Sequence, residues 1–339
     1  MEVDDASSNI RDRLLADKIT WLITGVAGFI GSNLLQALLE RDQVVVGLDN
    51  FSIGSQKNID LVEGKVEAYQ WQRFRLIKGD VRDLAVCKQC CEGVDVVLHH
   101  AALGSIPRSV ADPIATHQSN VDGFLNMLVA ARDAPVGRFV FASSSSVYGD
   151  HPALPRKEDV IGNPLSPYAL TKLINEHYAD VFAKTYGLSY IGFRYFNIFG
   201  DRQNSEGAYA AVIPRWRDAL LNQRPVTING DGTSSRDFCY VDNAIQANLL
   251  AATTKDSRAL GQIYNIAYGE RTSLNDLFEL MVSELGAERV KGESCKPNHA
   301  PFRKGDVPHS LADISKAREL LGYSPKVSVK DGLRLLLAD

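Results

Sequence analysis

A tyrosine and a lysine stand four residues apart in the segment "SPYALTK", at Tyr168 and Lys172. If this segment opens a helix, the two side chains share one face, one turn apart. A free tyrosine has a pKa of about 10 and is a weak base at neutral pH. A neighbouring ammonium group favours the phenolate and lowers that pKa, which suits general acid–base catalysis. The alternative is a solvated helix face on which the spacing is accidental.

A glycine-rich segment, "TGVAGFIG", carries Gly25, Gly28 and Gly31 between a strand-like run and a helical pattern. Glycines in this context let the backbone approach a pyrophosphate, while the helix N-terminus offers unpaired N–H groups. Asp49 closes the next strand, 18 residues after Gly31, where a carboxylate binds an adenosine ribose and repels a 2′-phosphate. We therefore predict a dinucleotide site for NAD rather than NADP. The alternative is a plain tight turn.

The ends of later strands extend this predicted cofactor site. Asp80 is a candidate for contact with the adenine, and its alternative role is to cap the end of a strand. Ala101, Ala102 and Leu103 follow another strand and suit a cofactor pressed against the edge of a sheet. The remaining predicted cofactor residues are Phe29, Ile30, Asn50, Phe51, Ser52, Gly54, Val81, Ser119 and Tyr195.

The composition is that of an ordinary globular protein, with 45% hydrophobic and 23% charged residues in 339. A formal net charge of -4 argues against a general electrostatic grip on nucleic acid. No run reaches the roughly 20 apolar residues that cross a bilayer, and the acidic N-terminus does not resemble a signal peptide. We therefore expect a cytoplasmic protein with neither a nucleic-acid nor a membrane partner.

Cysteine and histidine clusters offer little evidence of a metal site. Cys87, Cys90 and Cys91 could suggest metal or redox chemistry, but no second cluster with ligand spacing follows them. Their segment reads as an amphipathic helix, so we predict that the thiols pack in the core. His99 and His100 end an apolar strand-like run, and we interpret them as packing residues too.

Short apolar runs alternate with helical patterns through the first half of the chain. The predicted strands span residues 20–25, 43–50, 74–80, 94–102, 138–145 and 189–200. The predicted helices include residues 28–41, 115–134 and 167–187. This alternation is typical of a parallel sheet covered on both faces, so we predict a Rossmann-type, doubly wound α/β fold.

The rhythm changes near residue 198. Helices are expected near 212–222, 242–254 and 273–285, with a final one near 313–321. We predict a peripheral helix in residues 1–18, an NAD-binding domain in 19–197, and a smaller α/β substrate lobe in 198–339. The substrate lobe is expected to interleave with the last strands of the sheet.

The glycine loop, the run "SSSSVYG" at 143–149 and the Tyr168–Lys172 pair together resemble the extended short-chain dehydrogenase/reductase family. The resemblance spans nearly the whole chain and is greatest to the UDP-sugar 4-epimerases. It implies a tightly bound NAD and a UDP-sugar substrate. Tyr168 would be the base, Lys172 would also bind the nicotinamide ribose, and Ser144 would hydrogen-bond the sugar O4 and relay its proton.

The same resemblance separates epimerases from related enzymes. Dehydratases of the family carry an Asp-Glu pair before the Val-Tyr-Gly, and UDP-glucuronate decarboxylases carry a glutamate there. This chain has Ser145 and Ser146 at those positions, and a serine cannot act as a carboxyl acid or base. Without those groups, the simplest outcome is return of the hydride to the other face of the sugar.

Further residues are assigned to the substrate by resemblance. The guanidinium groups of Arg236 and Arg303 match phosphate oxygens geometrically, and these arginines would contact the diphosphate or the uridine end. Asp306 would hydrogen-bond the hydroxyls of the uridine ribose. The predicted substrate residues are Gly104, Ser105, Ser143, Ser144, Tyr168, Asn197, Ala211, Val212, Thr227, Asn229, Arg236, Arg303, Asp306 and Ser310.

The sugar is predicted from two positions. Bacterial UDP-galactose epimerases have a tyrosine where this chain has Ser310, and a longer side chain near Gly104 and Ser105. Smaller residues leave room for an N-acetyl group, so UDP-N-acetylglucosamine and UDP-N-acetylgalactosamine are the predicted substrates. Alternatively, Ser310 simply caps the following helix.

Other readings stay open. They are a UDP-glucose/UDP-galactose or UDP-hexuronic acid 4-epimerase, a net nucleotide-sugar oxidoreductase, and a non-catalytic NAD-binding protein. The resemblance also implies a homodimer formed through the helices near 115–133 and 168–186.

Overall fold

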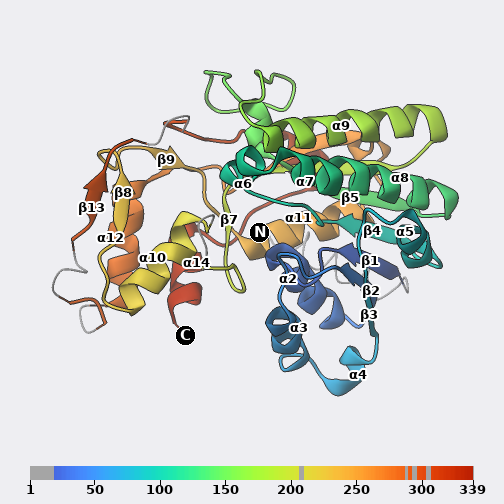
Figure 1. The fold of residues 1–339 in the computed structure, drawn as a ribbon, viewed down its shortest axis with the longest axis horizontal. Coiled ribbons are helices and arrows are strands. Elements are labelled where there is room, and N and C mark those ends of the chain that lie inside the picture. The colour runs from blue at the N-terminus through green and yellow to red at the C-terminus, as the bar shows by residue number, and fades with distance from the viewer. Residues whose placement is uncertain (1–18, 206–209, 287–288, 292–295, 303–306, 339) are drawn as a thin grey trace.

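Seven parallel strands form the centre of the protein in a computed structural model that describes residues 19–205, 210–286, 289–291, 296–302 and 307–338. The strand order is β11-β6-β5-β4-β1-β2-β3, and every pairing in this sheet is parallel. The bounds are β1 Thr20–Thr24, β2 Val44–Asp49, β3 Phe74–Lys78, β4 Val96–His99, β5 Arg138–Ser144, β6 Tyr190–Tyr195 and β11 Gln262–Ile266. The predicted α/β fold is confirmed (Figure 1).

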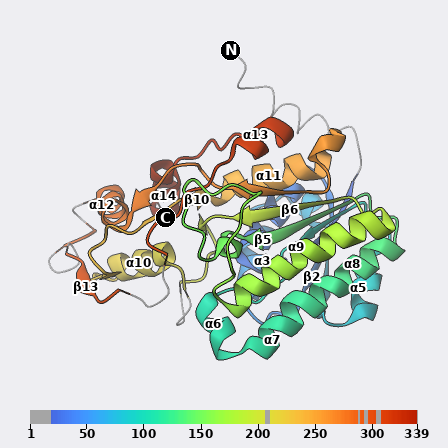
Figure 2. The same ribbon diagram turned by 90° about the horizontal axis from the view of Figure 1, so that it is seen from above.

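Helices cover both faces of the sheet, because successive strand residues point to opposite sides. In β1, Trp21 and Ile23 enter one apolar core and Leu22 enters the other. The first core is covered by α2 Phe29–Leu39, α3 Gln56–Glu63, α11 Val241–Thr253 and α13 Ser315–Leu321. The second is covered by α5 Leu84–Cys91, α8 Gly123–Asp133 and α9 Pro167–Tyr186. Figure 2 shows α8 and α9 side by side across the sheet.

A smaller lobe has its own apolar core and short two-stranded sheets. Its helices are α10 Val212–Leu221, α12 Leu274–Leu285 and α14 Val329–Leu337, and Trp216, Met281 and Leu333 meet between them. Its strands are β7 Ile198–Phe199, β8 Thr227–Asn229, β9 Ser235–Arg236, β10 Cys239–Tyr240, β12 Thr272–Ser273 and β13 Asn298–Ala300.

Shorter elements complete the described chain. They are α4 Ala68–Trp71, α6 Ile106–Ala111, α7 Pro113–His117, the π-helical turn η1 Gln118–Asp122, and the 3-10 turns η2 Ser145–Tyr148 and η3 Ser257–Ala259. The helix predicted for residues 1–18 lies outside the described residues.

Two helix predictions were wrong in detail. The helix expected over 115–134 is interrupted by η1, where the Asn120 side chain turns to bond the Leu103 backbone. The helix near 313–321 is not the last, because α14 follows it.

Gly332 weakens the helical pattern of α14, yet a Cβ there would lie 2.7 Å from the ring of Tyr240. Close packing therefore explains a glycine that sequence propensity disfavours.

The predicted packing of the cysteine cluster is confirmed. Cys87, Cys90 and Cys91 are buried in the core beneath α5 and α8, and burial raises their thiol pKa values to about 12, 11 and 12. Among the described residues, no group of three or more His, Cys, Asp or Glu side chains could hold a metal ion. Over the same residues, no helix has both the length and the apolarity that spanning a membrane requires.

Candidate active site

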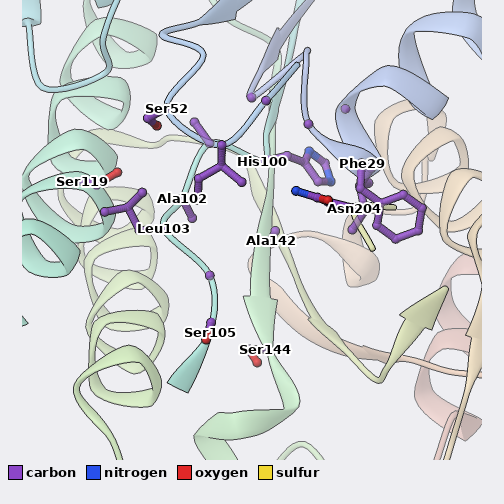
Figure 3. A pocket seen from close by; sticks show the side chains of 18 of the residues that line it. Phe29, Ser52, His100, Ala102, Leu103, Ser105, Ser119, Ala142, Ser144 and Asn204 are labelled. Carbon is purple, nitrogen blue, oxygen red and sulfur yellow. The ribbon is translucent and has the colours of Figure 1, made fainter. Parts of the chain in front are cut away.

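A cavity of about 540 Å³ lies at the carboxyl ends of the central strands. Its walls come from the glycine loop, the ends of β2, β4 and β5, helix α9, and the segment after β6. Figure 3 places Ser105 and Ser144 toward one end and Ser52 and Phe29 toward the other. Ligands of open α/β sheets bind at this edge, because strand ends and helix N-termini converge there.

The glycine loop brings backbone atoms into close contact. Gly25 has a φ of +71°, and a Cβ there would lie 2.8 Å from the Ala101 nitrogen. A Cβ on Gly31 would overlap the Gly25 carbonyl oxygen. Gly28 is the N-cap of α2 and carries no side chain that could bond the helix N–H groups. These features fit a dinucleotide pyrophosphate, since the N–H groups at the helix start remain directed toward an anion.

Asp49 lies at the end of β2 with its carboxylate in the cavity wall. It accepts hydrogen bonds from the Ala27 and Phe51 backbone N–H groups at 2.9 and 2.8 Å. Burial raises its pKa, and these two bonds oppose the rise. Each carboxylate oxygen can still accept a hydrogen bond from a ribose hydroxyl, which is the contact predicted for an NAD site.

Most predicted cofactor residues lie together in this cavity, whereas Phe51 and Asp80 do not line it. The Asp80 carboxylate instead binds the Arg82 side chain and the Asn50 amide. Its bonds with Arg82 lower the pKa of Asp80 to about 2. These contacts agree with the strand-end alternative for Asp80. The predicted cofactor residues that line the cavity are Gly25, Gly28, Phe29, Ile30, Gly31, Asp49, Asn50, Ser52, Gly54, Val81, Ala101, Ala102, Leu103, Ser119, Tyr168, Lys172 and Tyr195.

Helix α9 brings the predicted catalytic pair to the cavity. The helix begins where the Ser166 hydroxyl accepts the Ala169 N–H and Pro167 fills the first turn, and it ends at Gly187 with a φ of +74°. Tyr168 and Lys172 share the face that meets β5, with the Lys172 Nζ 5.9 Å from the Tyr168 ring centroid. Lys172 donates a hydrogen bond of 2.8 Å to the Ala142 carbonyl.

Burial acts on both members of the pair. It lowers the pKa of Lys172 to about 8, against the charge of Glu176, which raises it. Burial also raises the pKa of Tyr168, and a hydrogen bond from Ser144 opposes that rise. The expected lowering of the Tyr168 pKa depends on the positive nicotinamide ring together with Lys172, so it stays a prediction for the NAD-bound protein.

Ser144 and Ser143, at the end of β5, face different partners. The Ser144 hydroxyl accepts bonds from the Ser146 N–H and Oγ at 3.1 and 2.9 Å, which leaves its own proton for Tyr168 or a ligand. The Ser143 hydroxyl donates to the Glu176 carboxylate behind the cavity. Ser143 borders the cavity, so its predicted contact with substrate stays a prediction, in which its hydroxyl oxygen could only accept because its proton is donated to Glu176.

The predicted substrate residues fall into three groups. Those in the cavity wall are Gly104, Ser105, Ser143, Ser144, Tyr168, Asn197 and Ala211. Those that do not line it are Val212, Thr227, Asn229, Arg236 and Ser310. Arg303 and Asp306 lie outside the described residues.

The second group lies in the smaller lobe. Arg236 donates to the Ser235 and Pro308 carbonyls, and the Ser310 N–H donates to the Ser235 carbonyl, so both tie β9 to the segment after residue 306. Ser310 is not a helix cap, since α13 begins at Ser315 with Ile314 before it. The alternative that assigned Ser310 a capping role was therefore wrong.

His100 is a cavity residue that the sequence analysis interpreted only as packing. Its Nε2 lies 3.1 Å from the Tyr195 hydroxyl, and burial lowers its pKa to about 4, so the ring is neutral at neutral pH. His99, by contrast, is fully buried against Thr24 and Phe124, as predicted. The position of His100 at the end of a parallel strand was the available signal.

Other lining residues were also missed. Arg108 on α6 and Gln203 and Asn204 in the loop after β7 are the polar ones, and no local motif marked them. The others are Leu48, Ile53, Gly79, Ala142, Ile198 and Ala210.

Comparison with known proteins gives consistent matches. A model of the NAD dependent epimerase/dehydratase family matches residues 21–267. A putative UDP-glucose 4-epimerase of Methanocaldococcus jannaschii is 36% identical over 317 residues, which cover 92% of this chain and 95% of that protein.

Two solved structures are similar over nearly the whole chain. The UDP-N-acetylglucosamine 4-epimerase from Methanobrevibacter ruminantium M1, in complex with UDP-N-acetylmuramic acid, has a TM-score of 0.85 and 36% identity, covering 95% of this chain and 97% of that one. The UDP-glucuronic acid 4-epimerase from Bacillus cereus, in complex with UDP-glucuronic acid and NAD, has a TM-score of 0.83 and 34% identity, covering 94% and 98%.

The glycine contacts generate a test of the cofactor site. Gly31→Ala should remove most bound NAD and lower the melting temperature, because its Cβ would overlap the Gly25 carbonyl, an overpacking cost of about 1–3 kcal/mol. Gly64→Ala is the control, since its Cβ would have no atom nearer than 3.6 Å. Nucleotide content of the purified proteins and thermal melts provide the measurement. Equal NAD content in the two variants would contradict the prediction.

Proposed function

The chain belongs to the NAD dependent epimerase/dehydratase family, and from that premise we propose that it interconverts UDP-N-acetylglucosamine and UDP-N-acetylgalactosamine by inverting C4 of the sugar. NAD is its cofactor, and the three relatives compared above are each named as a UDP-sugar 4-epimerase, one of them putatively. The convergence of Tyr168, Lys172 and Ser144 beside the glycine loop carries the proposal.

The chain supplies the proton transfers. Tyr168 removes the proton from the sugar O4, and the Lys172 ammonium stabilises the phenolate that must form first. Ser144 would bridge O4 and the tyrosine oxygen, because the two bonds that its hydroxyl accepts leave its own proton free to donate. When the second hydride transfer is complete, Tyr168 returns the proton to O4.

NAD, held by the glycine loop and Asp49, would supply the group that accepts the hydride from C4 and returns it. The 4-keto sugar turns over between these transfers, so the hydride reaches its opposite face. Ser145 and Ser146 form the η2 turn beside the site, where dehydratases and decarboxylases of this family carry carboxylates. Serine side chains supply no group for elimination or decarboxylation, which favours return of the hydride.

Room near Gly104 supports the N-acetyl preference. Gly104 lines the cavity, and a Cβ on it would meet no atom within 4 Å. Ser105 follows with a short side chain at the start of α6. This open space suits the N-acetyl group at C2, which is bulkier than a hydroxyl.

Arg108 favours a second candidate, an acidic sugar. This arginine lines the same cavity from α6, one turn after Ser105, whose hydroxyl accepts the Arg108 N–H at 3.4 Å. A guanidinium group pairs well with a carboxylate. A UDP-hexuronic acid would present such a carboxylate at C6 of the sugar.

The main test is product analysis. The purified protein, incubated with UDP-hexoses, UDP-N-acetylhexosamines and UDP-hexuronic acids, should produce C4 epimers without accumulating stoichiometric NADH. Tyr168→Phe should reduce turnover at least about 100-fold, since it removes the acid–base group. Chromatographic separation of the epimers is the measurement. Retention of the unmutated rate by Tyr168→Phe would exclude the proposed mechanism and favour a non-catalytic role for Tyr168.

Two variants separate the candidate substrates. Gly104→Leu should lower kcat/KM about tenfold for the N-acetylated substrates while sparing UDP-galactose, because the added side chain fills the open space beside Gly104 in the cavity. Arg108→Gln should leave the N-acetylated substrates unaffected and should impair only UDP-hexuronic acids. Equal losses on both sugar classes from Gly104→Leu would contradict the C2 explanation, and a selective loss from Arg108→Gln would favour the acidic sugar.

A homodimer is also proposed. The helices expected to form the interface, near 115–133 and 168–186, correspond to α7, α8 and α9 (Figure 2). On α7, on α9 and on α6 beside α7, the exposed apolar residues are Ile114 at 70%, Val181 at 52% and Val110 at 64% of their surface. Exposed apolar residues grouped on packed helices mark an interaction face. A second copy of the chain would cover them.

A single substitution that introduces a charged side chain tests this dimer interface. Ile114→Asp should shift the protein from dimer to monomer, because a buried unpaired carboxylate is costly. Leu335→Asp on α14, also about half exposed at 52%, is the matched control and should remain dimeric. Sedimentation velocity gives the mass. A monomeric unmutated protein, or a dimeric Ile114→Asp protein, would contradict this interface.

A further inference from the structure

Three successive turns of α9 meet three consecutive residues at the end of β5. Tyr168 is hydrogen-bonded with Ser144, Lys172 donates to the Ala142 carbonyl, and Glu176 accepts from the Ser143 hydroxyl. Positions four apart on a helix share a face, so these three contacts form one ladder. The first two rungs belong to the catalytic pair. The third, at Glu176, has no assigned role.

Glu176 is itself held by a buried arginine. Arg194 on β6 donates from Nε to Oε1 at 3.0 Å and from Nη2 to Oε2 at 2.7 Å, and the two side chains are only 5% and 7% exposed. The Arg194 Nη1 donates to the Glu158 carbonyl at 2.9 Å, and the guanidinium lies 4.9 Å from the Tyr148 ring centroid. A forked, fully bonded pair of this kind fixes the carboxylate in one position.

The charge of Glu176 acts on Lys172. Lys172 is 3% exposed, and burial lowers its pKa to about 8 while Glu176 raises it. The other groups that face the ammonium are Tyr168 from the same helix and His99 and His100 from β4. Both histidines are neutral at neutral pH, since burial lowers their pKa values, and Arg194 adds a positive charge beyond Glu176. Among these groups, Glu176 is the one whose negative charge raises the Lys172 pKa.

We propose that Glu176 is a positioning residue for the reaction, which fixes the end of β5 through Ser143 and keeps Lys172 in its ammonium form. The proposal rests on the proposed function of Tyr168 and Lys172. The two roles are linked because Ser143 lies between two contact residues on β5. These are Ala142, which accepts the bond from Lys172, and Ser144, which is bonded with Tyr168. A displaced Ser143 would move Ser144 relative to Tyr168.

The sign of the pH effect follows from the charge. Lys172 must be protonated to favour the phenolate, so activity falls as pH rises through the Lys172 pKa. Glu176→Gln removes the negative charge and lowers that pKa further. The alkaline limb of kcat/KM should therefore move to lower pH by about one unit, a tenfold loss on that limb.

The decisive experiment compares variants of the full-length holoenzyme. Glu176→Gln should shift the alkaline limb, whereas Ser143→Ala should lower kcat several-fold with the limb unmoved. Glu158→Gln is the matched control, because this half-buried carboxylate accepts the Asn265 N–H and, within the part of the chain that the structure describes, makes no hydrogen bond to a residue of β5. It should leave the pH profile unchanged. An unmoved limb in Glu176→Gln, or an equal shift in Glu158→Gln, would overturn the proposal.

A second measurement does not depend on turnover. The ionisation of Tyr168 can be followed by near-ultraviolet difference absorbance, with Tyr168→Phe subtracted. In Glu176→Gln the Tyr168 pKa should rise, since Lys172 loses its proton earlier. An unchanged Tyr168 titration would contradict the inference. If no UDP-sugar is turned over by the unmutated protein, the proposed function fails, but this titration still tests the link between Glu176 and Lys172.

Glu176→Asp covers the case in which the glutamine variant does not fold. Aspartate keeps the charge but is one carbon shorter, so it should lose the Ser143 rung while the alkaline limb stays in place. A lower kcat in both Glu176→Asp and Ser143→Ala supports the positioning role. Unmutated kcat in both variants would overturn it.

Discussion

The contact between α9 and the end of β5 determines the geometry on which the site depends. The Lys172 ammonium is buried, and an unpaired buried charge is costly, so its bond to the Ala142 carbonyl fixes how the helix lies on the sheet. That placement brings Tyr168 opposite Ser144. The cavity wall, the cofactor loop and the sugar end are arranged around this one crossing of helix and strand.

Much of this arrangement was predictable because it is encoded locally. Apolar runs indicated the strands, and the glycines of the first loop indicated close backbone approaches that the structure contains at Gly25 and Gly31. The spacing of Tyr168 and Lys172 indicated a shared helix face. In each case the deciding interaction lies within one element or one turn, so the sequence pattern carries the information.

The parts that were missed depend on partners distant in the chain. His100 is bonded to Tyr195, which lies 95 residues later, and the pairing of Glu176 with Arg194 joins a helix to the following strand. Gly332 lies within α14, a helix that the sequence analysis did not predict, and the ring of Tyr240 packs against it. Such contacts are tertiary, and no periodicity or motif in one segment specifies them.

The substrate end was the least predictable for a related reason. Its candidate residues come from the smaller lobe, where Arg236 and Ser310 bond backbone carbonyls instead of lining the cavity. Relatives of similar identity are named for different UDP-sugars, so the family does not fix the sugar. The proposed N-acetyl preference rests on the local room at Gly104, and its competitor, an acidic sugar, rests on the charge of Arg108.

The position of β11 at the edge of the main sheet has a consequence for how the protein can be divided. This strand comes from the second half of the chain, yet it pairs with β6, and α11 buries Ala247 and Leu250 against the same sheet. A fragment that stopped after β7 would leave β6 as an open, aggregation-prone edge. The nucleotide-binding half therefore cannot be separated from the second half of the chain. Gene fusions, truncations and proteolytic fragments must retain the chain through residue 266 together with the helices that cover the sheet.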